Sequence, residues 1–325
     1  MAGNDKKSKN FLVSKIGGQQ LIVLGVIVAL FAFFCIKSDI FRSYTTILSM
    51  LDFSYFVAFM AIGVTFALIT GGNDLSIGTG MVCYGIIGGF FVTKLGLPVT
   101  VGFVITILCG VLMGCLNGFL VAILELPPFI ATLSTMMIAR GLGSIVTGGS
   151  SITWPADAWF KNIFKITIGE TKYPLGFLFV VAAVAIMTIF LRHTKPGRYI
   201  IAIGSNKEAT RLSGVNVVKW HMLAYIICGM FTGFAGVAYS ATFPTIAAGS
   251  GAGLELDAIC AAIIGGTSMY GGSGTIFGTL LGVYVMSILK TGLPLIGLQA
   301  NWQQIITGIV LLVAVFIDVV RGKNK

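Results

Sequence analysis

Charged residues are so sparse in this chain that they leave apolar intervals long enough to cross a membrane. The ranges 53–73, 95–124 and 220–254 contain no Asp, Glu, Lys or Arg. They hold 21, 30 and 35 residues, and a transmembrane helix needs about 20. Only 10% of all residues are charged, against roughly 25% in soluble domains. The chain is therefore predicted to be a polytopic membrane protein, which excludes soluble enzymes and nucleic-acid-binding domains.

Glycine clusters subdivide one of the remaining apolar intervals. Between Asp257 and Lys290 the chain carries a glycine-rich stretch over 265–274, so two elements are expected to share this interval, the first of them short or discontinuous. We predict an all-α fold with about ten transmembrane helices, some short or discontinuous. They are expected at about 20–36, 46–70, 75–93, 98–124, 128–147, 175–191, 221–241, 255–267, 272–290 and 302–320.

The distribution of basic residues predicts the orientation. Ten helices place both termini on one side of the membrane. The two termini and the 192–220 loop then hold thirteen basic residues, and the other side holds seven, Lys290 among them. Because Lys and Arg collect on cytoplasmic loops, both termini are predicted to be cytoplasmic. Short tails, 1–19 and 321–325, then flank a single transmembrane domain, 20–320, in a bacterial inner membrane.

A long outer loop, about 148–174, carries Trp154, Trp159 and Tyr173. Aromatic side chains commonly anchor a protein at the membrane interface. A docking surface for an external partner is the alternative, and the sequence leaves both open.

Several charges fall inside or beside the predicted helices, where each costs roughly 2.5–3.5 kcal/mol at mid-bilayer. The run Gly71-Gly72-Asn73-Asp74 predicts broken backbone near a permeation path, because irregular backbone at depth must face protein or water. Alternatively, Asn73 or Asp74 caps the next helix at the membrane surface. The charges in question are Asp52, Asp74, Arg140, Glu255 and Asp257.

The chain lacks the motifs of an ATPase or another enzyme. No P-loop lysine follows the glycines of 265–274, and no metalloprotease or serine-hydrolase motif occurs. Transport driven by ATP would therefore need an ATPase on another polypeptide. Because proton-coupled transporters carry acidic relays inside helices, Asp52, Asp74, Glu255 and Asp257 keep an ion-coupled secondary transporter as a rival.

The inner loop contains the signature of a short capped helix. Ser205 or Asn206 can cap a helix over 207–213, and Gly214 fits its end. Such a helix suits docking into a groove on a partner protein, although a generic surface helix has the same pattern. Its apolar positions at i, i+3 spacing are Ala209 and Leu212.

Four stretches follow one another in a recognisable order. They read G-G-N-D-L-S-I-G at 71–78, N-G then P-P-F-I-A-T-L over 117–133, G-R-x-x-x-A-x-G-x-N over 197–206, and E-L-D-A-I through G-G-T-S to further glycines over 255–278. Together they resemble the bacterial ABC-type sugar permeases of the ribose, galactose, xylose and autoinducer-2 group. Thr210 and Val215 depart mildly from the usual Ala and Ile of that family.

This resemblance implies the transmembrane permease subunit of a binding-protein-dependent importer, with no catalytic residue and no cofactor or metal of its own. It implies four kinds of partner: a second permease, identical or closely homologous; a cytoplasmic ABC ATPase that binds ATP and Mg²⁺; an extracytoplasmic sugar-binding protein; and a sugar. Membrane lipid surrounds the chain, and nucleic acid is not a partner.

The resemblance also assigns candidate residues. The ATPase-coupling residues are Gly204, Asn206, Glu208, Ala209, Arg211 and Gly214, with self-pairing of Glu208 and Arg211 as the alternative to partner contacts. The pathway candidates are Asn73, Asp74, Asn117 and Thr132, with interhelical hydrogen bonding as the alternative. Glu255 and Asp257 are structural or gating candidates. No residue separates a monosaccharide such as ribose, galactose or xylose from autoinducer-2 as the solute.

Overall fold

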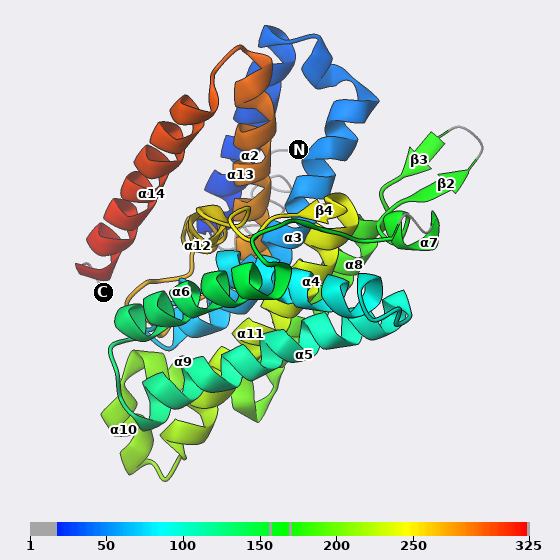
Figure 1. Cartoon of the computed structure of the whole chain (residues 1–325). Helices are drawn as coiled ribbons and strands as arrows, with labels where there is room; N and C mark the ends of the chain where they lie inside the picture. The colour runs from blue at the N-terminus through cyan, green and yellow to red at the C-terminus, as the bar shows by residue number, and fades with distance from the viewer. Residues whose placement is uncertain (1–17, 156–157, 169–170, 324–325) are drawn as a thin grey trace, which may run out of the picture.

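The computed structural model describes residues 18–155, 158–168 and 171–323. It shows an all-α bundle with two small antiparallel strand pairs, as Figure 1 shows. The predicted tail 1–19 lies almost wholly outside the described residues. The fold class predicted for a polytopic membrane protein is confirmed.

Helices occupy all ten predicted positions within the described residues. Eight of them are long and apolar enough to cross a membrane, and two, α4 and α12, are shorter. The ten are α2 (Gly18–Lys37), α3 (Tyr44–Ile69), α4 (Ile77–Thr93), α5 (Val99–Gly118, continued by η2, Phe119–Ile123), α6 (Pro128–Thr147), α8 (Leu175–His193), α11 (Val217–Thr242), α12 (Leu254–Ile264), α13 (Ile276–Leu295) and α14 (Ala300–Lys323).

Two long helices, α3 and α11, form the centre of the bundle. In their most apolar windows 78% and 72% of the residues are buried, against 6% in α14. Glycines bring α5 directly onto α11, because a Cβ at Gly229 would overlap the backbone of Gly110 and Gly114. Small residues at such crossings let transmembrane backbones approach closely.

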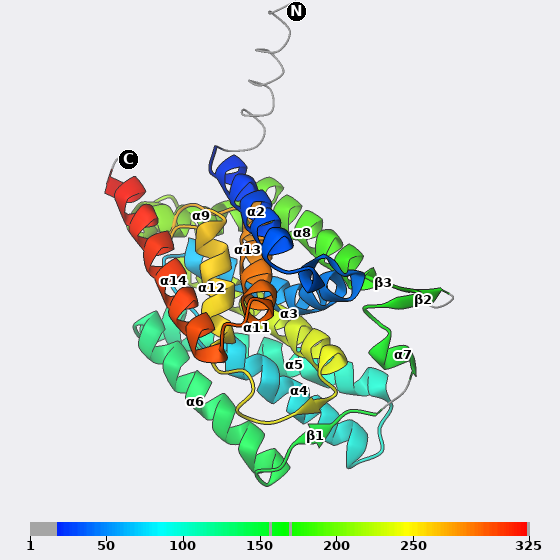
Figure 2. The same ribbon diagram turned by 90° about the horizontal axis from the view of Figure 1, so that it is seen from above.

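The first and last described residues and the inner loop lie at the same end of the bundle (Figure 2). Gln19, at the start of α2, donates a hydrogen bond to the Ile264 carbonyl at the end of α12 (3.2 Å). Asp318, near the end of α14, accepts one from the Met269 backbone N–H (3.0 Å). The inner loop folds beside them as α9 (Lys195–Ser205) and α10 (Lys207–Leu212). This is the end that the basic residues predict to be cytoplasmic.

The opposite end carries the outer loop. Its strand β1 (Ile152–Thr153) pairs with β4 (Thr245–Ile246), which follows α11. After the short helix α7 (Ala158–Lys161), β2 (Ile166–Ile168) pairs with β3 (Thr171–Tyr173). The turn η1 (Ile40–Arg42) joins α2 to α3.

Trp154 is neither an interfacial anchor nor a docking residue, so both interpretations of the sequence are wrong for it. Its side chain is 1% exposed, stacks on Phe160 and donates from Nε1 to the Gly85 carbonyl (3.1 Å). It closes the outer loop onto α4. Trp159 and Tyr173 are exposed.

Two stretches differ from the sequence-based expectation. The range 272–275 is not helical, because Gly272 has a φ of +74° and α13 starts only at Ile276. The helix α9 was not expected. Its signals are Thr194, whose side chain caps the Gly197 N–H, and a proline in the first turn.

Candidate translocation and coupling site

A buried polar network lies where the chain breaks between α3 and α4. The carboxylate of Asp74 is 1% exposed and accepts hydrogen bonds from the backbone N–H (2.9 Å) and hydroxyl (2.6 Å) of Ser76. Its second oxygen accepts one from Asn117 Nδ2 (3.2 Å), at the end of α5. Asn117 thus ties the break to the neighbouring helix.

The network extends to α6 through a residue that sequence reasoning missed. Thr135 donates its hydroxyl to Asn117 Oδ1 at 2.7 Å. The predicted residue Thr132, one turn earlier, is equally buried but donates only within its own helix, to the Pro128 carbonyl (2.8 Å). The hydroxyl pattern at i, i+3 was visible in the sequence, but the choice between the two threonines depends on the facing helix.

The surface-cap interpretation of Asp74 is wrong. Helix α4 starts at Ile77 with Ser76 as its N-cap residue, and Asp74 is enclosed by protein. The broken backbone that the glycines predict is present over 70–76. Asn73 is half-buried, and its carbonyl accepts a hydrogen bond from the Tyr225 hydroxyl (3.4 Å).

We expect Thr135→Val to lower the free energy of unfolding by about 1–3 kcal/mol, because it leaves the buried Asn117 carbonyl oxygen without its donor. Thr132→Val is the matched control on the same helix, since it removes no bond between helices, and a change below about 0.5 kcal/mol is expected. Thermal midpoints of both variants in detergent test this. Equal midpoints would contradict the network's contribution.

The two acidic residues at the start of α12 make different contacts. Glu255 accepts from the Gly253 N–H with both oxygens (3.1 Å each), which satisfies a backbone donor at the helix start. Asp257 is fully buried and lies 3.0 Å from the ammonium of Lys290 on α13. The assignment of Lys290 to an outer loop is therefore wrong, because the helix continues past it to Leu295. Asp52 pairs with Lys165 of the outer loop.

The inner-loop helix α10 presents most of its side chains outward. Asn206 caps it by accepting from the Ala209 N–H (2.9 Å), and Gly214 follows it with a φ of +78°. Glu208 and Arg211 pair with each other at 2.7 Å, so the self-pairing alternative holds in this conformation. Leu212 is 79% exposed, and the neighbouring Ala209 is exposed too.

Gly204 has a different position from the other coupling candidates. It faces the bundle, where a Cβ would overlap the Ile69 carbonyl and lie 2.5 Å from the Gly272 backbone nitrogen. The same Ile69 carbonyl accepts a hydrogen bond from the Gly272 N–H (2.9 Å). The end of α9, the end of α3 and the turn before α13 therefore meet backbone to backbone, next to the break that holds Asp74.

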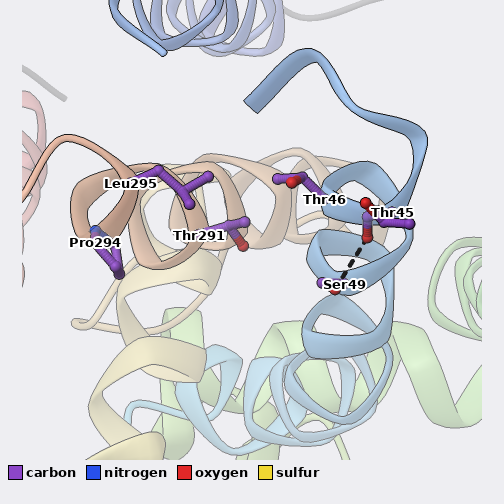
Figure 3. Close-up of a pocket in the computed structure, with 6 residues that line it drawn as sticks. All are labelled: Thr45, Thr46, Ser49, Thr291, Pro294 and Leu295. Atoms are coloured by element: carbon purple, nitrogen blue, oxygen red, sulfur yellow. Dashed lines mark hydrogen bonds between the residues drawn. The ribbon is translucent and has the colours of Figure 1, made fainter. Parts of the chain in front are cut away.

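A separate crevice of about 220 Å³ opens at the outer end of the bundle, between the start of α3 and the end of α13 (Figure 3). Hydroxyl side chains and two apolar residues line it, and none of the predicted pathway residues does. Its lining residues are Thr45, Thr46, Ser49, Thr291, Pro294 and Leu295. Among all the described residues, no group of three His, Cys, Asp or Glu side chains is placed to hold a metal ion.

Known proteins match this chain over most of its length. Residues 46–315 match the family described as branched-chain amino acid transport system / permease component. The ribose import permease protein of Escherichia coli (strain K12) is 34% identical over 92% of both chains. The fructose import permease protein of Rhizobium meliloti is 31% identical, over 96% of this chain and 88% of that one. The galactose/methyl galactoside import permease protein of Haemophilus influenzae is 31% identical over 94% and 93%.

No solved structure gives a significant match to the chain. The matched range takes in the Asp74 network, the inner-loop helices and the Asp257–Lys290 pair, and the relatives cover nearly the whole chain. The chain therefore belongs to the family of ABC-type sugar importer permeases, which are multi-pass proteins of the bacterial inner membrane.

Proposed function

We propose that this chain is the transmembrane subunit of an ATP-driven importer that moves a monosaccharide such as ribose, galactose or xylose across the inner membrane. A second permease, identical or closely homologous, completes the pathway, and a sugar-binding protein delivers the solute to the outer face. A separate ABC ATPase binds ATP and Mg²⁺, and this chain binds no cofactor. ATP binding and hydrolysis reorient the helices between inward- and outward-open states.

The exposed apolar face of α10 carries this proposal. A leucine that is 79% exposed on a short capped helix is costly to leave in water and suits a groove on a partner. The helix stands at the predicted cytoplasmic end, where an ATPase must bind. Close to α10, Gly204 on α9 contacts the last residue of α3 and the 265–274 turn. Movement of α9 and α10 therefore displaces the backbone next to the break at Asp74.

Two other functions remain as candidates. Autoinducer-2 or another small polar solute suits the same family and the same partners. An ion-coupled secondary sugar transporter would use the buried carboxylates of Asp74 and Asp257 and would need no ATPase.

We expect the tagged chain, extracted in mild detergent, to copurify with a stoichiometric P-loop ATPase. Leu212→Asp should reduce the recovered ATPase at least tenfold and abolish uptake, because it places a charge in the apolar contact. Leu212→Met is the matched control, since it keeps an apolar side chain of similar size, and it should retain both. Mass spectrometry of the purified complex and uptake of labelled ribose, galactose and xylose measure the two effects.

Three outcomes would contradict the proposal. The chain could be recovered alone from an extract in which other complexes survive. Leu212→Asp could retain the ATPase at the level of Leu212→Met. Uptake could be abolished by a proton uncoupler but not by deleting the ATPase, which would favour the ion-coupled transporter.

A further inference from the structure

Arg140 is an exposed charge in the middle of a membrane-spanning helix. It lies on α6, and its side chain faces away from the bundle. Among the described residues it makes no ion pair, since the pairs involve Arg42, Lys165, Lys207, Arg211 and Lys290. By contrast, Asp257 and Asp318, which also lie within described helices, have partners inside the protein.

Arg140 lies well inside α6, away from both ends of the helix. It stands seven residues before the end of α6 at Thr147 and twelve after its start at Pro128. At 1.5 Å per residue, these separations are about 10 Å and 18 Å. Helical side chains tilt toward the helix N-terminus, so the Arg140 side chain is directed toward Pro128, the more distant end of α6. Lipid contact at this depth is strongly unfavourable for a charge.

The exposed surface of α6 around Arg140 carries both polar and apolar side chains, among them Met137, which is 68% exposed. Ser144, one turn after Arg140, is exposed on the same side of the helix. Ile138 is 50% exposed and lies about 160° around the helix from Arg140 at 100° per residue. The outward helices α5 and α8 carry no charge between their ends. Arg140 therefore sets the exposed surface of α6 apart from theirs, because a charge in contact with lipid at this depth is unfavourable.

We propose that Arg140 lines a water-filled pathway between two permease chains and donates hydrogen bonds to the hydroxyl oxygens of the passing solute. This rests on the proposed function, because the second chain covers the face of α6 that carries Arg140. A guanidinium has five N–H donors and no acceptor, so it binds the oxygen-rich surface of a sugar. Its positive charge also repels inorganic cations, which a pathway for neutral solutes must exclude.

The accessibility test uses cysteine labelling of the complete transporter in its membrane. The six native cysteines, Cys35, Cys83, Cys109, Cys115, Cys228 and Cys260, are first replaced by alanine. Arg140→Cys is then compared with Ile138→Cys, which has nearly the same depth on the same helix. The probe is a membrane-impermeant anionic thiosulfonate, applied to spheroplasts and to inside-out vesicles. We expect labelling of Arg140→Cys from at least one side and none of Ile138→Cys.

The binding test uses the reconstituted transporter and the labelled sugars that the wild type takes up. Arg140→Gln should raise the apparent KM about tenfold, as expected for losing a hydrogen bond from a charged donor. Arg140→Lys, which keeps the charge and three donors, should raise it less. Copurified ATPase should stay at the wild-type level in both variants, which separates this effect from misassembly.

Equal labelling of the two cysteine variants, or none of either, would overturn the pathway assignment. Labelling of Arg140→Cys with an unchanged KM in Arg140→Gln would overturn the contact with solute. Cysteine labelling requires no ATP hydrolysis. If the chain proves not to be an ATP-driven importer, the labelling result still tests whether Arg140 faces water.

Discussion

Replacing Lys290 by methionine is expected to destabilise the folded bundle by about 3 kcal/mol, because it leaves a buried carboxylate without its counter-charge. Asp257 is fully buried, and neither of its oxygens has a hydrogen-bond partner among the described residues apart from this ion pair. Asp257→Asn should cost less, since the side chain of Lys290 is 23% exposed and can turn its ammonium toward water. The thermal midpoint in detergent gives the order of the two variants.

The matched control for this prediction is the double variant Asp257→Leu, Lys290→Met. A buried ion pair can be replaced by apolar residues of similar volume at little cost, so the double variant should recover most of the midpoint lost by Lys290→Met alone. A double variant as unstable as the single one would show that the pair does not balance the charge of Asp257.

Gly204→Val is expected to abolish uptake. No Cβ fits at this position, because it would overlap the Ile69 carbonyl and approach the Gly272 nitrogen, and both are backbone atoms that cannot rotate away. Overpacking of this kind costs about 1–3 kcal/mol and shifts the backbone. We expect the contact of α9 with the end of α3 to open, so that movement at the ATPase no longer reaches the break at Asp74.

Gly25→Ala is the matched control for Gly204→Val. Gly25 also lies in a helix, but a Cβ there would meet no atom within 4 Å, so uptake and expression should stay at the wild-type level. The measurement is uptake of labelled sugar normalised to protein in the membrane. Wild-type uptake by Gly204→Val would contradict the role of this close contact.

The polar network at Asp74 shows how far motif reasoning reached. The sequence singled out Asp74, Asn117 and Thr132 from a resemblance, and the structure brings the first two into hydrogen-bonding distance. It leaves Thr132 bonded within its own helix and adds Thr135. Residues one turn apart have similar local sequence signals, so only the position of α5 decides which hydroxyl meets Asn117. Whether these residues line a pathway stays a prediction.

Lys290 and Trp154 show where sequence reasoning failed. Both were placed at the outer surface, because a charge between apolar runs reads as a loop and tryptophan favours the membrane interface. Each is held inside by a partner distant in the sequence, Asp257 for the lysine and Gly85 with Phe160 for the tryptophan. Such a partner removes the cost of burying a polar group, and nothing local in the sequence reveals it.

The sequence by itself determined the ten apolar helices of the bundle and their order, although it did not reveal α9. Long intervals without charge must form helices in a bilayer, because only internal hydrogen bonds satisfy the backbone there, and helices stand at all ten predicted positions. The capped helix after Asn206 also follows from local hydrogen bonding. Only the tertiary structure decided which polar side chains are paired and which remain unpaired. It buries Asp257 against Lys290 and leaves Arg140 exposed. Pairing depends on which helix faces meet in space, and no local sequence signal specifies that.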